Sequence, residues 1–493
     1  MPEIHSLNII KSRIMTVSVK NLFILFIFIY LPVSLSSQTK VWTLKACVDE
    51  ALSKNVLLNQ EILNNDIYKI NFEQAKANRY PNLNLNDNQN FTYGRAVDPV
   101  SNQFLNQNIQ SNNLALSTTV TIFNGLQNYY AIKQNKYYYD AGGFDIEKAK
   151  NDLSLQVAAA YLQVLYDYEA VDIDKEQVDA STAQVERTQK YVNAGKSPLG
   201  SLYQMQSQLA ADKYAEIAAE NQLALAKVDL MQLMEMPVTK DFEIEKPGIN
   251  EPEIKDANTA EDIYKTAEQN QPQIKSAAFK INSADAGLRM AKGGLYPKLS
   301  VTGSLRTAYS SASQQISYQT ISNLETIGYL QSNPSDNVIG YVPSEVIQKD
   351  KYPFTHQFQD NFNQFVGFSL TVPIFNNFTV KYNIDKAKIN LQSVQLDEIN
   401  TKNQLRKSIE QAYTDVIGSA KQYSAAKEQV KSEERTYLDM KTKYENGVAT
   451  ATDFIIEQNN FNKVKQALIQ TKYNYLFKIK VVDFYLGKPL TTL

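Results

Sequence analysis

The chain has 493 residues and a formal net charge of −2, with 50 lysines and arginines against 52 aspartates and glutamates. No basic block interrupts this balance, which argues against a nucleic-acid partner. Thirty tyrosines against a single tryptophan are typical of surfaces that are half apolar and half wet, as at a membrane interface.

The residue types that carry catalysis are scarce. Cys47 is the only cysteine, so no internal disulfide can form, and His356 is the only histidine beyond the first few residues. The sequence contains no metal-ligand spacing, no glycine-rich phosphate loop and no nucleophile elbow. We therefore expect no enzymatic activity, no cofactor and no bound metal.

The amino terminus predicts an export signal over residues 1–37. Lys11, Arg13 and Lys20 precede the apolar run Leu22–Leu31, and small serine residues follow it. No other stretch approaches the roughly eighteen apolar residues of a membrane-spanning helix. If the exported chain enters a membrane, we expect it to do so by strands.

Residues 38–236 form the first of two similar units. Thr43 begins a helix that is expected to reach Tyr80–Pro81, where proline ends it. Two strands with period-two alternation follow at about 82–93 and 113–123. The first of these strands has an entirely polar face, which includes Asn84, Asn86 and Asn88.

After a proline-containing linker at 237–258, residues 259–493 repeat the same order of elements. Strands are expected at about 298–309 and 365–375, and residues 310–362 between them are expected to form an exposed polar loop. Small or polar residues alternate with apolar ones along both strands. This face includes Ser300, Thr302, Ser369 and Thr371.

Long helices follow each pair of strands. They are expected over about 126–193, with a bend at Gly142–Gly143, and over about 378–444, and they are followed by turns at Gly195 and Gly447 and by helices over about 202–236 and 453–486. Apolar residues spaced seven apart in the last helix of each unit predict coiled-coil-like packing of antiparallel helices.

The two units are in register with each other. Tyr80–Pro81 matches Tyr296–Pro297 at an offset of 216, whereas Ile122–Asn124 matches Ile374–Asn376 at an offset of 252. The 36-residue difference therefore lies between the two strands of the second unit. Insertions are tolerated best at exposed tips, so we expect the loop at 310–362 to lie at an exposed tip of the molecule.

Geometry then predicts an assembly. A tilted strand of eleven residues spans about 28 Å, close to the apolar thickness of an outer membrane, and a helix of 68 residues extends about 100 Å. Four strands cannot close a barrel, and open edges in lipid leave backbone groups unpaired. Three copies would supply twelve strands around an aqueous lumen, onto which Asn84, Ser300, Ser369 and their polar neighbours would face.

In this duplicated pattern the sequence resembles the TolC family of outer-membrane efflux and secretion channels. The resemblance covers Trp42 to Leu486 and is carried by the order of elements, the Y-P-x-L junctions, the I-F-N strand ends and the Y-x-N-G turn Tyr444–Gly447. It implies a homotrimer with a twelve-stranded barrel in the outer membrane and an α-helical tunnel in the periplasm. It also implies an inner-membrane transporter as a partner, joined through a periplasmic adaptor protein.

The same resemblance implies a periplasmic gate at the helix turns. Asp453, six residues after Gly447, matches the family's first acidic position, while the second is occupied by Ile456 with Glu457 beside it. The acidic partner position of the first unit is Ser201, and Tyr444, just before the second turn, is a further candidate residue of the gate. Asp453 is either a carboxylate of the gate or a helix cap in solvent, and the two roles are compatible.

A different class of protein also accounts for part of the pattern. A secreted or surface coiled-coil adhesin without channel activity would need the long helices. It would not need four period-two strands placed symmetrically between them, and for this reason we prefer the channel.

Overall fold

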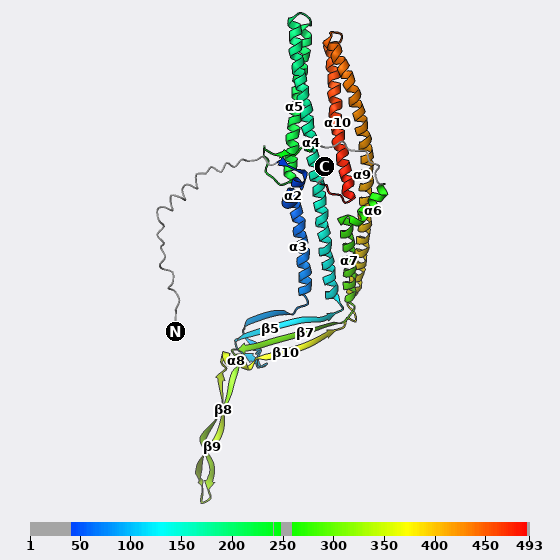
Figure 1. The fold of residues 1–493 in the computed structure, drawn as a ribbon. Coiled ribbons are helices and arrows are strands. Elements are labelled where there is room, and N and C mark those ends of the chain that lie inside the picture. The colour runs from blue at the N-terminus through cyan, green and yellow to red at the C-terminus, as the bar shows by residue number, and fades with distance from the viewer. Residues whose placement is uncertain (1–40, 240, 248–258, 491–493) are drawn as a thin grey trace, which may run out of the picture.

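The computed structural model describes residues 41–239, 241–247 and 259–490. The expected signal at 1–37 and part of the expected linker lie outside the described residues. Figure 1 shows an elongated molecule in which long helices run side by side, a sheet lies at one end of them, and a narrow hairpin continues beyond the sheet. The arrangement separates a helical part from a strand part, as the sequence predicts.

The helices account for most of the described chain. Their bounds are α2 Leu44–Lys54, α3 Val56–Ala77, α4 Gln127–Asn193, α5 Leu199–Leu233, α6 Ala260–Asn270, α7 Pro272–Gly293, α8 Phe354–Asp360, α9 Thr379–Glu445 and α10 Ala451–Tyr485. The strands are β1 Val41–Trp42, β2 Asn82–Thr92, β3 Arg95–Val97, β4 Phe104–Asn106, β5 Ile109–Asn124, β6 Glu243–Ile244, β7 Lys298–Ser310, β8 Gln314–Leu330, β9 Asn333–Lys351 and β10 Asn363–Thr371.

The two halves have helices of equal length at constant offsets. Helices α4 and α9 each have 67 residues and α5 and α10 each have 35, and both pairs start 252 residues apart. Helices α2 and α3 match α6 and α7 at an offset of 216. The insertion is thus confined to the segment between β7 and β10.

The helix expected to run from Thr43 to about Ala77 is divided in two. Asn55 interrupts it, and its side chain accepts a hydrogen bond from the Leu58 amide at 3.0 Å, which caps α3. In the second half the break falls at Gln271, before Pro272 at the first position of α7. Helix α4 is unbroken across Gly142–Gly143, the position of the expected bend.

The main sheet has four antiparallel strands in the order β10-β7-β5-β2. Each unit contributes one pair, and β5 pairs with β7 to join the two units. Strand β10 ends at Thr371 rather than near Phe375. Proline has no amide hydrogen to donate, so Pro373 cannot continue the ladder, and Asn377 and Phe378 take positive φ values of 51° and 58° before α9 begins.

The segment at 310–362, expected as a polar loop, is largely ordered. Strands β8 and β9 pair along almost their whole length. Serine, asparagine and glutamine are frequent in β8 and β9, so their sequences lack the clear alternation of apolar and polar residues that predicts a strand. Helix α8 then returns the chain to the sheet, where the buried Gln357 accepts from the Ser310 amide at 2.9 Å and donates to the Ser310 carbonyl at 3.0 Å.

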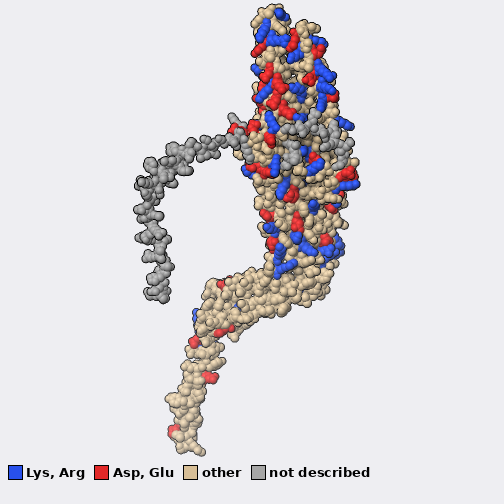
Figure 2. All heavy atoms as spheres, viewed as in Figure 1, with Lys and Arg blue, Asp and Glu red and all other residues tan. Residues whose placement is uncertain are grey.

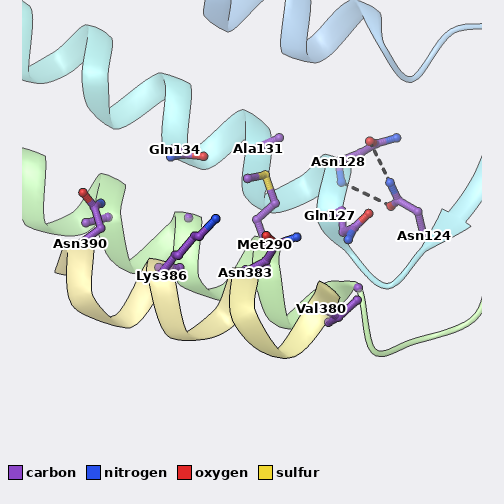
Figure 3. A pocket seen from close by; sticks show the side chains of 15 residues that line it. Asn124, Gln127, Asn128, Ala131, Gln134, Met290, Val380, Asn383, Lys386 and Asn390 are labelled. Atoms are coloured by element: carbon purple, nitrogen blue, oxygen red, sulfur yellow. Dashed lines mark hydrogen bonds between the residues drawn. The ribbon is translucent and has the colours of Figure 1, made fainter. Parts of the chain in front are cut away.

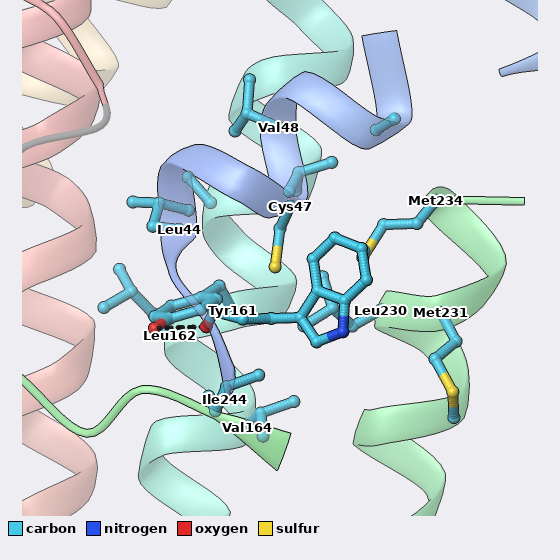
Figure 4. Close-up of a cluster of buried hydrophobic side chains, with 14 of the residues drawn as sticks. Leu44, Cys47, Val48, Tyr161, Leu162, Val164, Leu230, Met231, Met234 and Ile244 are labelled. Atoms are coloured by element: carbon cyan, nitrogen blue, oxygen red, sulfur yellow. Dashed lines mark hydrogen bonds between the residues drawn. The ribbon is translucent and has the colours of Figure 1, made fainter. Parts of the chain in front are cut away.

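Among the described residues, the largest buried apolar cluster lies where α2, the middle of α4 and the end of α5 meet (Figure 4). Trp42, Cys47 and Leu230 are buried in it, and the Tyr161 hydroxyl donates to the Glu245 carbonyl at 2.7 Å. Strand β6 pairs in parallel with β1, so part of the expected linker at 237–258 packs against this core instead of connecting the units freely.

Charged side chains are distributed unevenly. Figure 2 shows them over the helices, whereas the sheet and the β8–β9 hairpin carry few on the face in view. Among the described residues, none of the helices contains an apolar run long enough to cross a membrane.

Candidate functional site: the helix tips and the polar face of the sheet

The residues expected to line a lumen share one face of the sheet. Residues directly opposite each other in an antiparallel ladder lie on the same face. Asn84 pairs with Ser117, which pairs with Ser304, and Thr119 connects Asn82 to Thr302 in the same way. The Thr119 and Thr302 hydroxyls are 3.4 Å apart. The pairs Ser300–Ser369 and Lys298–Thr371 extend this face to β10.

The opposite face of the sheet is apolar and exposed. Val120, Val301 and Phe368 lie in one row across three strands, and Leu85, Leu116 and Leu305 lie in another. Phe368 is 76 % exposed and Leu85 is 67 % exposed. Exposed rows of this kind on one face, with amides and hydroxyls on the other, suit a sheet that separates lipid from water.

Both helix turns at the far end of the molecule use glycine for the same reason. Gly195 and Gly447 have φ values of 69° and 73°, in the left-handed region that favours glycine. At the first turn the Gly195 amide donates to the Val192 carbonyl at 3.0 Å and the Lys196 amide donates to that of Tyr191 at 2.8 Å. These two bonds form a Schellman motif, and the second turn repeats it.

Asp453 lies at the third position of α10 and is exposed. The helix cap is Thr450 rather than Asp453. The Asp453 amide donates to the Thr450 hydroxyl at 3.2 Å, and that hydroxyl donates back to the Asp453 carboxylate at 2.7 Å. This capping box orients the carboxylate beside the turn. Ser201 occupies the same position of α5, whose first turn has no acidic residue.

The two residues that follow Asp453 in the expected gate differ in environment. Ile456 is 53 % exposed, so it offers an apolar side chain to solvent near the tip. Glu457 is partly buried against α9. Burial raises the pKa of the Glu457 carboxyl, and the neighbouring Glu433 carboxyl raises it further. One Glu457 oxygen is buried without a hydrogen-bond partner.

Tyr444 connects the two coiled coils near their tips. Its ring stacks on Phe454 with centroids 5.0 Å apart, and its hydroxyl lies 3.2 Å from the Thr188 hydroxyl on α4. Beside it, Arg187 donates to Glu445 at 2.6 Å. The helices α4 and α9 are therefore linked by a hydroxyl pair and an ion pair within one turn of each other.

Sequence reasoning did not find Arg187, Thr188 or Glu445. Both members of the ion pair are about two-thirds buried at the side chain, yet no local pattern marks them, because they lie 258 residues apart. A further link, the reciprocal amide pair of Gln208 and Asn459 at 2.9 and 3.2 Å, was also missed. Contacts between the units require knowledge of how the units pack, which repeat spacing does not supply.

A groove lies at the other end of the helices, next to the sheet. It has a volume of about 650 Å³ and is lined by α4, α7 and α9. Figure 3 shows Lys386 extending from α9 between amide side chains such as Gln134, Asn383 and Asn390. The amides and a single ammonium group offer hydrogen bonds to polar solutes and no catalytic constellation. Within the described residues no cluster of His, Cys, Asp and Glu could hold a metal ion.

The fold and these residues define a class of elongated envelope protein, in which an amphipathic sheet continues into long helical coiled coils. The sequence profile of the outer membrane efflux proteins matches residues 47–234 and 263–487. The chain belongs to the outer membrane efflux protein family. This membership places it in the outer membrane, with its helical part in the periplasm.

Individual relatives are distant in sequence and similar in fold. The outer membrane protein TolC of Escherichia coli is 21 % identical over 454 residues, which cover 92 % of this chain and 83 % of that one. VceC of Vibrio cholerae superimposes with a TM-score of 0.69 at 15 % identity, covering 91 % of this chain and 96 % of that one. The open state of the MtrE channel of Neisseria gonorrhoeae superimposes with a TM-score of 0.63 at 18 % identity, covering 91 % of this chain and 89 % of that one.

Proposed function

We propose that three copies of this chain form a passive conduit from the periplasm to the exterior. The observation that carries the proposal is the open four-stranded sheet. Within the described part of the chain, β2 and β10 each have a partner on one side only, and the sheet is apolar on one face and polar on the other. In lipid, each unpaired backbone group along an open edge costs several kcal/mol, so sister chains must cover both edges.

Three copies fit this requirement best. Twelve strands enclose a space wide enough for water, whereas eight strands fill their interior with side chains. In the twelve-stranded barrel the polar rows through Asn84, Asn86, Asn88, Ser300, Thr302, Ser369 and Thr371 face the lumen. The helices α4 and α9, each about 100 Å long at 1.5 Å per residue, continue the conduit as a periplasmic tunnel.

The conduit has no energy source of its own in this proposal. We expect a periplasmic adaptor protein to contact the helical part and to join it to an inner-membrane transporter. Cargo would then be selected at the inner membrane, in an efflux or type I secretion system. A coiled-coil adhesin remains the second candidate, favoured only by the length of the helices.

The gate is proposed at the helix tips. Three Asp453 carboxylates would surround the axis, with Ile456 and Glu457 behind them and with Gly195, Ser201 and Gly447 at the turns. In each chain the Arg187–Glu445 pair and the contact of Tyr444 with Thr188 would hold the two coils together in the closed state. The pair is close and only about one-third exposed on each side, which limits screening by water.

Native mass measurement and planar bilayer recording test the conduit together. The mature chain in mild detergent is expected to have the mass of a trimer and to conduct ions after insertion. A monomer with folded strands, or a trimer that never conducts, contradicts the proposal. For the gate, Arg187→Glu should raise the closed-state conductance, and the charge swap R187E/E445R should restore it.

A further inference from the structure

Basic residues gather where the helices meet the sheet. They lie within about three turns of the sheet-side ends of the helices, roughly 16 Å. We call seven of them the basic collar: Arg79, Lys133, Lys136, Arg289, Lys292, Lys381 and Lys388. Lys69 and Lys76 of α3 and Lys386, which lines the groove, lie in the same range and are not counted in it. Figure 2 shows lysine and arginine side chains concentrated at this end of the helices on the face in view.

The collar has a net positive charge. Lys136, Arg289 and Lys388 each have an aspartate partner, at 2.7, 2.8 and 3.6 Å. For the other four collar residues no carboxylate lies within ion-pair distance in the described part of the chain. Seven basic groups less three aspartates leave +4 per chain, and a trimer would carry +12. Four unpaired basic groups per chain leave this end of the helices open to an anionic partner from outside the chain.

The collar residues on α4, α7 and α9 lie on the opposite side of these helices from the groove. With 3.6 residues per turn, Lys381 and Lys388 fall about half a turn around α9 from the groove residues Val380, Asn383 and Ala387. The same separation holds on α7, where Arg289 and Lys292 oppose Gly287 and Gly294, and on α4. The groove is lined by α4, α7 and α9 together. In the proposed tube we place the groove on the inner side, so the collar faces outward.

Exposed aromatic side chains lie beside the collar. Tyr80, Tyr296 and Phe375 are 74, 59 and 69 % exposed at the junctions of strand and helix. The Lys133 ammonium lies 4.8 Å from the centre of the Tyr129 ring, and Lys381 lies near the rings of Phe378 and Tyr382. Exposed aromatic rings in this position are typical of a boundary between lipid and water.

We infer that the basic collar binds the phosphate groups of phospholipids in the periplasmic leaflet of the outer membrane. This inference rests on the proposed function for the orientation of the chain. Lysine and arginine are the side chains that recognise phosphate, and rings at the boundary set the depth at which they meet it. Bound headgroups would fix the height of the sheet in the membrane and leave the groove to face the tunnel.

Lipid titration of the full mature protein tests the inference. The protein in non-ionic detergent is titrated with phosphatidylglycerol or with phosphatidylcholine, and the lipids bound per chain are counted by native mass measurement. We expect a preference for phosphatidylglycerol that 0.5 M salt weakens strongly, and we expect the double variant K292Q/K381Q to bind it about tenfold more weakly. A second variant, R79Q/K133Q, changes the other two collar residues that have no carboxylate partner, and it should weaken phosphatidylglycerol binding to a similar extent.

The matched control is K190Q/K213Q, which removes two exposed lysines far from the collar, on α4 and α5. Equal binding of phosphatidylglycerol by the parent and both collar variants overturns the inference, and so does an equal loss in the control. Displacement by millimolar inorganic phosphate would show that free anions, not headgroups, occupy the collar. The same spectra give the oligomeric mass, so a missing trimer counts against the proposed function alone.

Discussion

At the scale of single residues, Asp453 and Ser201 allow a direct comparison of equivalent positions in the two units. They occupy the same position of α10 and α5, next to equivalent turns, but only Asp453 carries a charge and completes a capping box. Repeat spacing predicted which positions correspond. It did not predict that Thr450 supplies the cap, because the choice between two neighbouring polar side chains depends on the backbone angles of the turn.

Asp453→Ala should weaken cation preference and block by multivalent cations in bilayer recordings. Three like charges around a narrow axis attract cations, and alanine removes them. The lost capping contact costs about 1 kcal/mol per helix, which is small for so long a coiled coil. Ser201→Ala serves as the control and should change neither property. Unchanged ion selectivity in Asp453→Ala would limit Asp453 to its role in the helix end.

At the scale of elements, Glu433 on α9 and Glu457 on α10 bring two carboxyl groups together. Because burial and Glu433 raise the pKa of Glu457, the folded chain holds this proton more tightly than the unfolded chain. The contribution of the group to stability is therefore full below its ordinary pKa of 4.5 and is lost as pH rises through the raised value.

Glu457→Gln should remove this loss of stability at higher pH, because glutamine does not ionise. At neutral pH we expect the variant to be more stable than the parent by about 0.5 kcal/mol, since the pair is partly exposed and screened. Below the ordinary pKa of glutamate the difference should vanish. Thermal unfolding of both proteins across pH 4–8 measures it, with the exposed neighbour Glu434→Gln as the control. A constant difference at all pH values would mean that packing, not charge, separates the two proteins.

The β8–β9 hairpin was the element that the sequence described least well. Strands 17 and 19 residues long replaced an expected loop, because serine, asparagine and glutamine weaken the apolar alternation by which strands are recognised. In contrast, the four strands of the main sheet were located to within a few residues. Apolar and polar residues alternate more strictly along these strands, as expected where one face of a sheet meets lipid and the other meets water.

The hairpin is expected to lie outside the cell, because it leaves the sheet at the end opposite the helices (Figure 1). Lys349 and Lys351 are its only tryptic sites and both are exposed. Trypsin added to intact cells should therefore cut after one of them, and the variant K349Q/K351Q should lose the hairpin cut. The exposed Arg95, between β2 and β5 at the same end of the sheet, is a separate tryptic site that the variant leaves in place. Cleavage near Gly195 or Gly447 under these conditions would reverse the orientation of the chain.

At the scale of the whole molecule, duplication determines most of what could be predicted. Offsets of 216 and 252 residues located equivalent helices, turns and strands before any contact was known. They could not show how the α4–α5 coil meets the α9–α10 coil. Those contacts, such as Lys465 with Glu176 at 2.7 Å and Gln466 with Asp174 at 2.7 Å, join residues that are not equivalent in the repeats.

The contacts between the two coiled coils at their tips depend on the equal lengths of the helices in the two units. Removing one heptad from α9 and the matching heptad from α10, on the tip side of the Tyr423–Tyr475 stack, shortens one coil by roughly 10 Å. Arg187 and Gln208 then lie opposite the wrong residues, so we expect a persistent conductance in bilayers while the trimer survives.

Removing one heptad from all four helices should restore the register and the low closed-state conductance. The second variant has a shorter tunnel but matched tips, so it separates length from register. Tip contacts such as Arg187–Glu445 tie the two coils at a fixed height, and only matched lengths can satisfy them. If the variant with one shortened coil stays closed, the tips do not carry the gate, and the constriction must lie nearer the sheet.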